Sequence, residues 1–223
     1  MGTNEKPVRG VLLDIDGTLV ESNDAHAHAW VKALAESGRT VSFDAVRPLI
    51  GMGGDKLLPK VCDLDADSKE GKAVSKRRDK IFIDEYLPHL KACRGAKDLL
   101  KTLKEKGLKM AVASSAREDE LGPLLKLCGA DKVIDSATSS DDAEESKPDP
   151  DILHTSLKKI GLSASEVVML GDTPYDVEAA RKAGARVIAL RCGGWTDPDL
   201  KADAVYDDPA DLAKQLDTSP LKL

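Results

Sequence analysis

The sequence predicts an α/β fold in which a helical segment interrupts a domain built on a parallel β-sheet. Two observations carry this prediction. From Arg94 onward, short apolar runs alternate with helical patterns, which is typical of a parallel sheet with helices on both faces. Before that point, the stretch from about Ser42 to Tyr86 is largely helical and shows no strong strand signal. It is too long for a simple crossover connection, so we expect an inserted domain.

The predicted strands are short and apolar, as expected for strands that are buried on both faces. They are Val11–Leu13, Met110–Ala113, Lys132–Ile134, Val167–Leu170 and Val187–Leu190, with an edge strand at Ala204–Tyr206. We therefore expect a Rossmann-like parallel sheet core formed by residues 1–21 and 93–223, and a small α-helical cap domain formed by residues 22–92.

Residues typical of helix ends mark the predicted helices. These helices are Ala25–Ser37, Ala96–Lys106, one ending at Leu127, one ending near Ile160, one running from Thr173 to Gly184, and Pro209–Leu216. Asp149 and Pro150 fit an N-cap followed by proline at the first helical position. Pro123 should either kink its helix or mark where that helix starts.

The composition indicates a globular protein without a concentrated basic surface. The 223 residues include 41% hydrophobic and only 3% aromatic residues, so the core must consist mainly of Leu, Val, Ile and Ala. The formal net charge is -6, with Lys and Arg spread widely, which argues against nucleic-acid binding but allows a small anionic substrate. Residues 1–10 lack the apolar run of a signal peptide, and no stretch is long enough to span a bilayer. We expect a cytoplasmic monomer or weak homodimer with no membrane partner.

The four cysteines are far apart in the sequence. Cys62, Cys93, Cys128 and Cys192 form no CxxC pair, so we expect neither a disulfide framework nor a zinc site. Cys192 lies in Arg191–Gly194, which we interpret as a surface turn after the fifth strand. The pattern therefore predicts reduced thiols.

Charged and hydroxyl residues stand where the predicted strands finish. Asp14 and Asp16 come after the first strand, Ser114 ends the second, Lys147 precedes the helix after the third, and Asp172 ends the fourth. In an open parallel sheet, ligands bind at the carboxyl ends of the strands. The topology should therefore bring these side chains from distant parts of the chain into one site.

The charges of this predicted site indicate a bound cation. Two unit charges about 4 Å apart repel by about 4 kcal/mol at an effective dielectric constant near 20, so three clustered carboxylates need compensation. A hard divalent ion with oxygen ligands fits, and Mg²⁺ suits a phosphate substrate best. Lys147 would add a fixed positive charge beside Asp14, and Ser114 would donate to phosphate oxygens. Gly17 lets the backbone of the first loop turn tightly.

These residues resemble the four motifs of the haloacid dehalogenase-like superfamily. Asp14–Val20, with the sequence Asp-Ile-Asp-Gly-Thr-Leu-Val, resembles the first motif, and Ser114 resembles the second. Lys147 within Ser146–Pro150 resembles the third motif, and Gly171–Asp176 resembles the fourth. The motifs occur in the expected order and span essentially the whole chain. The helical insert resembles the cap found in the phosphoglycolate phosphatase and β-phosphoglucomutase branch.

The resemblance implies a magnesium-dependent phosphomonoester hydrolase that acts on a small phosphorylated metabolite. Asp14 would be the nucleophile and would form an aspartyl phosphate. Asp16 would protonate the leaving group and then take a proton from the attacking water. Thr18 would orient the loop, while Ser114 and Lys147 would bind phosphate oxygens.

The resemblance also implies how the metal is held. The carboxylates of Asp14 and Asp172 and the main-chain carbonyl of Asp16 would bind Mg²⁺. Asp176 would lie near the water shell of the ion. The spacing of Thr173 and Asp176 also fits a capping box, and the two roles of Asp176 are compatible.

Further substrate contacts are predicted with alternatives left open. Gly17 and Ser115 are candidates near the phosphate, and Ser115 rather than Ser114 could be the main donor. His26 could contact substrate through the cap or could be an exposed helix residue. The glycine-rich loop that ends at Lys56 resembles a specificity loop, in which Lys56 could reach a phosphorylated ligand, but it could equally be a flexible connector.

Three other functions compete with hydrolysis. Halide-removing relatives lack the second aspartate, so Asp16 favours phosphoryl transfer. Mutases of the β-phosphoglucomutase type carry an acidic residue before the fourth-motif aspartate and an arginine in the cap loop, where this chain has Gly171 and Gly54. A catalytically silent scaffold is also compatible with the fold, but the complete set of charged site residues argues against it.

Overall fold

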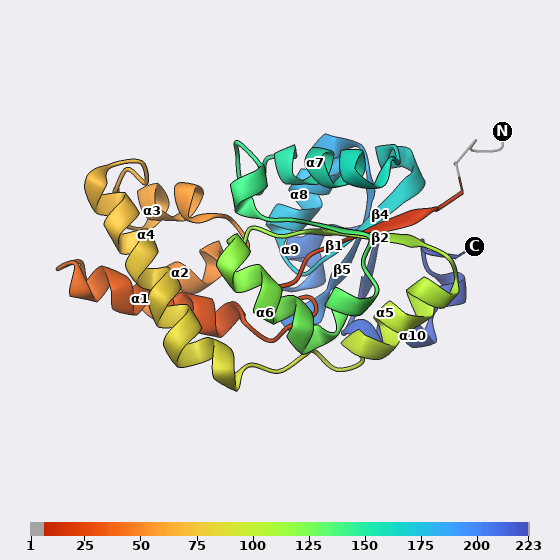
Figure 1. The fold of residues 1–223 in the computed structure, drawn as a ribbon, viewed down its shortest axis with the longest axis horizontal. Coiled ribbons are helices and arrows are strands. Elements are labelled where there is room, and N and C mark those ends of the chain that lie inside the picture. The colour runs from red at the N-terminus through yellow and green to blue at the C-terminus, as the bar shows by residue number, and fades with distance from the viewer. Residues whose placement is uncertain (1–6, 223) are drawn as a thin grey trace.

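A computed structural model describes residues 7–222, which form a six-stranded parallel sheet with helices on both faces and a group of helices at one end (Figure 1). The strand order is β3-β2-β1-β4-β5-β6, and every neighbouring pair is parallel. The strands are β1 (Gly10–Leu13), β2 (Lys109–Ala113), β3 (Ser136–Thr138), β4 (Val167–Gly171), β5 (Arg186–Leu190) and β6 (Ala204–Tyr206). This architecture confirms the predicted α/β fold.

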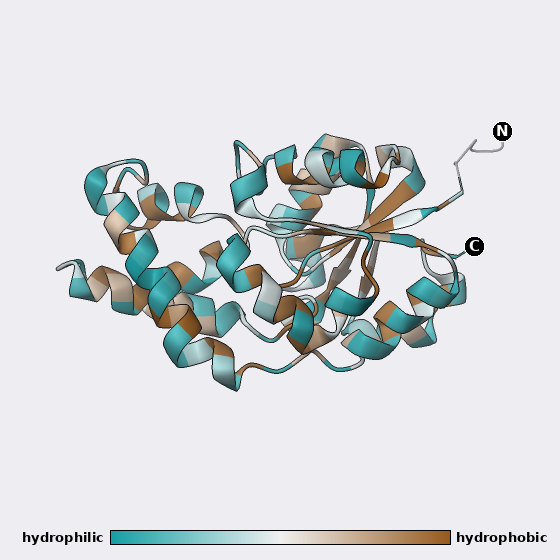
Figure 2. Ribbon diagram, viewed as in Figure 1, coloured by the Kyte–Doolittle hydropathy of each residue, from teal (hydrophilic) through white to brown (hydrophobic). Residues whose placement is uncertain are grey.

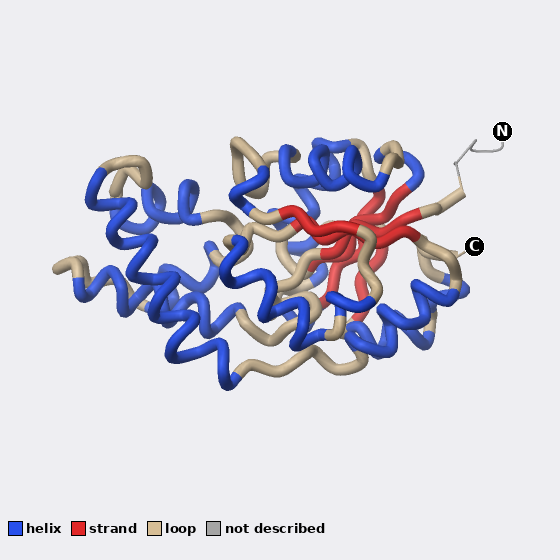
Figure 3. Tube along the Cα trace, viewed as in Figure 1, coloured by secondary structure: helices blue, strands red, loops and turns tan. Residues whose placement is uncertain are grey.

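Ten α-helices are present in the described residues. They are α1 (Asn23–Glu36), α2 (Phe43–Val46), α3 (Gly54–Cys62), α4 (Lys69–Ile81), α5 (Ala96–Glu105), α6 (Glu118–Cys128), α7 (Asp151–Ile160), α8 (Pro174–Ala183), α9 (Asp197–Leu200) and α10 (Pro209–Lys214). Helices α1 to α4 gather at one end of the molecule, away from both termini, while the strands cluster together at the other end (Figures 1 and 3).

Alternation along the strands explains why helices cover both faces of the sheet. Strand β1 is fully buried, with Leu13 in the same apolar cluster as α5 and α6 and Leu12 in the cluster that contains residues of α7 and α8. The central strands β1 and β4 consist of apolar residues and glycine, whereas the helices mix hydrophilic and hydrophobic residues (Figure 2). Apolar burial on both faces is what holds a parallel sheet in place.

The predicted third strand was placed wrongly. Strand β3 covers Ser136–Thr138, not Lys132–Ile134. The amide N–H groups of Val133 and Ile134 both bond to the carbonyl of Ala130, so this segment is a turn after α6. Its two apolar side chains pack against the core as partly buried groups. Their hydrophobicity therefore reflects packing against the core rather than strand formation.

Two predicted helix starts also need correction. Helix α7 starts at Asp151 with Pro150 as its N-cap residue, so Asp149 is not the N-cap. Helix α6 starts at Glu118, and Pro123 lies inside it rather than at its start. The edge strand β6 and the final helix α10 occur where they were predicted.

The chain passes twice between the sheet and the group of helices α1 to α4. The two passages lie side by side, because Val20 and Ala92 form an antiparallel bridge. The division into a core domain and a cap domain at residues 22 and 92 stays a prediction. Residues 1–6 and 223 of the predicted core, and most of the segment considered for a signal peptide, lie outside the described residues. Within the part that is described, no helix is long and apolar enough to cross a membrane.

Candidate active site

The site forms where β1, β2 and β4 end. Leu13 of β1 lies opposite Leu170 of β4, and the amide of Asp14 donates to the carbonyl of Leu170 at 2.9 Å. Parallel register therefore places Asp14 beside Gly171, with Asp172 one residue further along β4. The convergence predicted from the order of strands is observed in the structure.

Gly17 makes the tight turn that follows β1. Its φ angle is 79°, which favours glycine. A Cβ atom at this position would lie 2.2 Å from Asp172 Oδ2 and 2.1 Å from Asn23 Nδ2. The loop can approach these two side chains only because residue 17 has no side chain.

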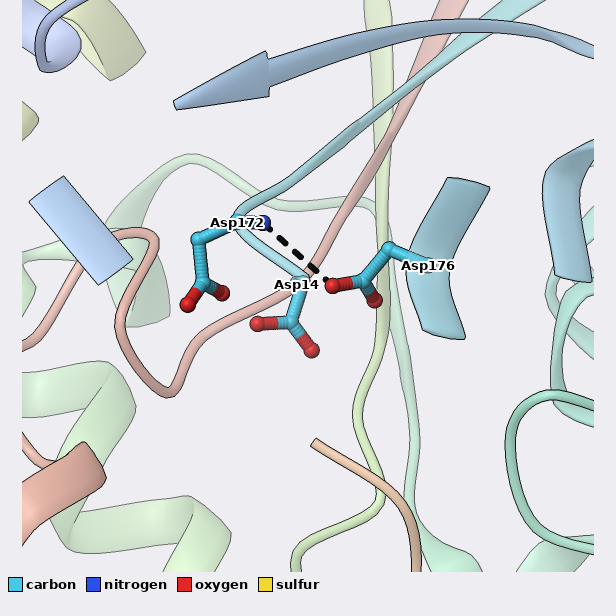
Figure 4. Close-up of side chains that lie close together, drawn as sticks. All are labelled: Asp14, Asp172 and Asp176. Atoms are coloured by element: carbon cyan, nitrogen blue, oxygen red, sulfur yellow. Dashed lines mark hydrogen bonds between the residues drawn. The ribbon is translucent and has the colours of Figure 1, made fainter. Parts of the chain in front are cut away.

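Three buried carboxylates face one another at this edge of the sheet (Figure 4). Asp14, Asp172 and Asp176 each offer an oxygen atom, and these atoms all lie within 4.8 Å of one another. Carboxylate oxygens so arranged are the ligands that hard divalent cations prefer. The donor set therefore fits the predicted Mg²⁺, and Asp176 belongs to it together with Asp14 and Asp172.

The pKa values of Asp14 and Asp172 are raised, which shows that ionisation of the whole cluster is unfavourable without a metal. Burial is the main reason that the pKa of Asp14 is raised to about 7, with repulsion from Asp176 and Asp16 adding to it and Lys147 opposing it. The pKa of Asp172 is also raised, by burial and by the charges of Asp14 and Asp176. A bound cation would reverse both shifts, because it favours the ionised forms.

Lys147 supplies the only lysine ammonium group in direct contact with the cluster among the described residues. Its side chain is fully buried, and its Nζ donates to Asp14 Oδ1 at 2.6 Å and to Asp176 Oδ1 at 2.7 Å. Burial alone would lower the pKa of Lys147, but the two carboxylates raise it above its ordinary value. Lys147 is therefore a permanent charge in the site.

Asp176 caps helix α8 with one carboxylate oxygen and contacts Lys147 with the other. Its Oδ2 accepts from the amide and the hydroxyl of Thr173, which completes the predicted capping box of α8. Its Oδ1 accepts from Lys147. The cap of α8 thus fixes the orientation of a carboxylate that faces Asp14.

Thr18 and Asn23 hold the remaining carboxylate oxygens. The Thr18 hydroxyl lies 3.0 Å from Asp14 Oδ2 and 2.9 Å from Asp172 Oδ1. Asn23 Nδ2 donates to Asp172 Oδ2 at 2.8 Å, while its buried Oδ1 has no partner among the described residues. Asn23 was missed in the sequence, because an asparagine at the start of a helix is usually a capping residue.

Asp16 lies slightly apart from the carboxylate cluster and has partners of its own. Its Oδ1 accepts from Ser22 Oγ at 2.5 Å and lies 2.8 Å from His26 Nε2. Burial would raise the pKa of Asp16, but its contacts with His26 and Ser22 lower it below its ordinary value. His26 is buried, so the alternative of an exposed helix histidine is wrong.

Arg78 of α4 fixes the tautomer of His26. Its Nη2 lies 2.7 Å from His26 Nδ1, and a guanidinium group can only donate. His26 Nδ1 must therefore accept, which leaves the ring proton on Nε2, where it is donated to Asp16. Arg78 also donates to Glu120 Oε1 at 2.5 Å and lies over the ring of Trp30.

Glu120 lies on helix α6 and connects Arg78 to that helix. It is fully buried, and its pKa is raised by burial against the opposing effect of Arg78. Its second oxygen has no partner among the described residues. Arg78 and Glu120 were missed in the sequence, because a charged residue in a helix without a nearby motif normally belongs to a solvated face.

The two candidate serines have different surroundings. Ser114 is fully buried, and its hydroxyl accepts from the amide of Ala116 at 3.0 Å. Ser115 is partly exposed and lines a cavity of about 740 Å³ between the loops of the sheet and helices α3 and α4. Ser115 is therefore the more accessible of the two candidate phosphate donors.

The cavity is lined by side chains of both charges. Lys76 and Arg117 contribute cationic groups, and Asp55 and Asp141 contribute anionic ones. Ser146, the residue before Lys147, also lines it. Asp14 is not part of the lining, so the cavity is a space beside the carboxylate cluster rather than around it.

Lys56 has ion-pair partners of its own, and the turn after β5 lies closer to the site than expected. Lys56 Nζ pairs with Glu145 and, at 3.3 Å, with Asp149, and it does not line the cavity. In Arg191–Gly194, Gly193 is buried and its carbonyl accepts from Asn23 Nδ2 at 3.4 Å. This segment therefore borders the site and is more than a surface turn.

Comparison with known proteins identifies the family. The family model described as haloacid dehalogenase-like hydrolase matches residues 11–190. The phosphoglycolate phosphatase of Rhodospirillum rubrum is 32% identical over 220 residues, which cover 93% of this chain and 90% of that protein. A crystal structure of a hydrolase from Pseudomonas syringae superposes with a TM-score of 0.87 at 29% identity, covering 94% of this chain and 98% of that one.

One relative is much longer than this chain. The chloroplastic protein SUPPRESSOR OF QUENCHING 1 of Arabidopsis thaliana is 35% identical over 188 residues, which are 82% of this chain but only 18% of that protein. The match to it therefore concerns a single segment. Together, the fold, the carboxylate cluster and the matched residues 11–190 lead to one conclusion: the chain belongs to the haloacid dehalogenase-like hydrolases and is a phosphatase.

Proposed function

We propose that this phosphatase hydrolyses a small phosphorylated metabolite with Mg²⁺ as cofactor and Asp14 as nucleophile. The observation that carries the proposal is the buried cluster of Asp14, Asp172 and Asp176 with Lys147 bonded to two of its members. A bound cation would favour the ionised form of such a cluster, and its oxygen ligands suit Mg²⁺. When bound by Asp14, Asp172 and the carbonyl of Asp16, Mg²⁺ would supply positive charge to the phosphoryl oxygens.

The residues of the chain divide the chemistry between them. Asp14 would attack phosphorus, and the bond from phosphorus to the ester oxygen would break as an aspartyl phosphate forms. Asp16 would give its proton to the departing oxygen and later remove one from the water that releases phosphate. Lys147 would hold the Asp14 carboxylate in place, and Thr18 would fix its second oxygen.

The contacts of Asp16 favour the second half of this reaction. Ser22 and His26 both donate to Asp16 Oδ1 and so stabilise the ionised carboxylate. An ionised Asp16 is the form that can accept a proton from water. This arrangement supports hydrolysis of the aspartyl phosphate.

The leaving group would occupy the cavity of about 740 Å³ beside the cluster. Its volume lies in the usual range for small-molecule sites, and the mixture of charged side chains suits a polar, hydroxylated metabolite. Relatives named phosphoglycolate phosphatase support a small phosphorylated substrate.

A panel of phosphomonoesters, measured with Mg²⁺ and again after removal of the metal by a chelator, tests the proposal. We expect release of phosphate that depends on Mg²⁺, and a loss of kcat of at least about 10³-fold in Asp14→Asn. The variant should keep the far-UV circular dichroism of the parent. Turnover of Asp14→Asn near the parent rate would exclude the covalent mechanism, and conversion of a sugar phosphate to its isomer without phosphate release would indicate a mutase.

A further inference from the structure

Two cysteines that are far apart in the sequence meet at the carbonyl oxygen of Gly17. The sulfur of Cys93 lies 3.9 Å from this oxygen, and the sulfur of Cys192 lies 3.2 Å from it. The nearby Cys192 thiol, together with burial, raises the pKa of the Cys93 thiol. All four cysteines of the chain are free in this structure.

The backbone holds both cysteines in these positions. The amide of Cys93 donates to the carbonyl of Leu19 at 2.9 Å, where the chain returns from the helices α1 to α4 toward α5. The amide of Cys192 donates to the carbonyl of Asp207 at 2.9 Å, in the turn after β5. The thiols therefore approach each other because two parts of the fold place them there.

The two thiols differ in their access to solvent. Cys192 is exposed, whereas Cys93 is only 4% exposed. Such a pair has the arrangement needed for oxidation in two steps, with an accessible thiol that reacts first and a sheltered thiol that resolves the product. Cys62 and Cys128 form no such pair with another cysteine in the described residues, because neither has a cysteine among its contacts.

We propose that Cys93 and Cys192 are a modification site, at which a low-molecular-weight disulfide oxidises the two thiols to an intramolecular disulfide. The Cys192 thiolate attacks one sulfur of oxidised glutathione, and the first glutathione leaves and takes up a proton. Cys93 then attacks the Cys192 sulfur of the mixed disulfide, and its proton goes to the second glutathione. Two protein thiols lose two electrons, and one glutathione disulfide gains them to become two thiols.

The cross-link would act on the nucleophile loop. A disulfide brings its sulfur atoms to about 2.05 Å, so the contacts of both thiols with the Gly17 carbonyl must change. Gly17 follows Asp16 directly, and Asp172 and Asn23 leave no room for a side chain at position 17. We therefore expect oxidation to lower turnover, and this second effect rests on the proposed function, whereas the cross-link itself does not.

Oxidised glutathione is the probe for the test, followed by alkylation of the remaining thiols and digestion with trypsin. Cleavage after Lys91, Arg94, Arg191 and Lys201 releases residues 92–94 and 192–201 as separate peptides, each with one cysteine. We expect the number of alkylated thiols to fall from four to two, and these two peptides to appear joined by a disulfide that dithiothreitol cleaves. Activity should fall by about tenfold or more and recover on reduction.

Matched variants separate the possible outcomes. Cys192→Ser should abolish the joined peptides and keep its activity in oxidised glutathione, while Cys62→Ser should behave like the parent. A stable glutathione adduct on Cys192 with Cys93 still alkylated would overturn the proposal, as would four alkylated thiols after oxidation. A joined pair with unchanged turnover would overturn the effect on the loop. If the reduced enzyme hydrolyses no phosphomonoester, the proposed function fails, and the peptide analysis still decides the cross-link.

Discussion

The ends of the strands and the helices α1 to α4 contribute to the site in different ways. Asp14 and Asp172 are carried by backbone that the sheet fixes directly, because they follow the paired strands β1 and β4. His26 and Arg78 reach the site from helices and depend on packing between elements for their positions. The positions of Asp14 and Asp172 are therefore determined by the topology of the sheet, and those of His26 and Arg78 by side-chain contacts between packed elements.

This difference predicts unequal responses to mutation. The strand-end cluster consists of Asp14, Asp172, Asp176 and Lys147. A change in it should affect both stability and chemistry, because these buried charges compensate one another. A change in the helices should affect the orientation of His26 or the fit of the leaving group while the cluster itself persists. Four experiments test the comparison, from the largest expected effect to the smallest.

Substitution of Lys147 by methionine should have the largest effect. It leaves Asp14 and Asp176 buried without their cation, and the loss of one partner from a buried ion pair costs about 3–5 kcal/mol. We expect a lower Tm in chelator, partial recovery in Mg²⁺, and no measurable turnover. Lys182→Met, which removes an exposed lysine that pairs with Asp149 and Glu178, is the matched control and should leave Tm and activity unchanged. A parental Tm for Lys147→Met in chelator would contradict the argument.

Substitution of Arg78 by methionine should have a smaller effect on activity. Without Arg78, the tautomer of His26 is no longer fixed, and we expect kcat/KM to fall by about 10-fold to 100-fold. Glu120 would be left buried without its partner, so Tm should also fall.

A double variant separates these two effects. Arg78→Met with Glu120→Leu removes both charges, so stability should recover while activity stays low. Arg77→Met is the matched control, because Arg77 is the neighbour of Arg78 on α4 and forms an exposed pair with Glu36. Recovery of activity in the double variant would show that the arginine contributes only to stability.

Much of the strand-end cluster could be predicted from the sequence, and little of the helical contribution could. Asp14 and Asp172 follow apolar runs that are correctly predicted as buried strands, and parallel topology then brings them together. Nothing in the local sequence of Arg78 distinguishes it from its neighbour Arg77, whose side chain is more exposed. Its role depends on the distance between α4 and α6, which no local pattern encodes.

The same limit explains the misplaced third strand. Val133 and Ile134 have the composition of a strand, but Gly129 ends α6 in a left-handed conformation and turns the chain before the sheet is reached. The hydrophobic pattern therefore predicted correctly that these two side chains pack against the core. It predicted a strand, however, where the chain forms a turn. The partners of Lys56 also could not be predicted, because Glu145 and Asp149 are distant from it in the sequence.

The pH dependence of stability without metal tests the charge balance of the cluster. The pKa of Asp14 is about 7 in the folded chain and has a reference value of 3.8, so the folded chain keeps a proton that the unfolded chain has lost. The stability contributed by this proton is complete below the reference value and is lost as pH rises through about 7. In chelator, Tm should therefore be higher near pH 5.5 than near pH 8.

Excess Mg²⁺ should abolish or reverse this difference, because the metal binds the ionised carboxylates and stabilises the folded state where they are deprotonated. Asp14→Asn should show a flatter profile in chelator, since it removes the group with the raised pKa. Thermal unfolding in chelator and in Mg²⁺ at both pH values provides the measurement. A Tm that rises toward pH 8 in chelator would show that Asp14 is ionised in the metal-free protein.

The smallest effect is expected from Lys56→Ala, which tests whether the cap loop contacts the substrate. Lys56 is paired with Glu145 and Asp149 at the surface, and such pairs contribute less than about 1 kcal/mol to stability. Because Lys56 does not line the cavity, KM should stay within about twofold of the parent value. Lys76→Ala removes a lysine that does line it, and a roughly fivefold rise in KM would correspond to about 1 kcal/mol of lost binding. If Lys56→Ala raises KM more than Lys76→Ala does, the loop moves onto the substrate, and helices α1 to α4 change position during the reaction.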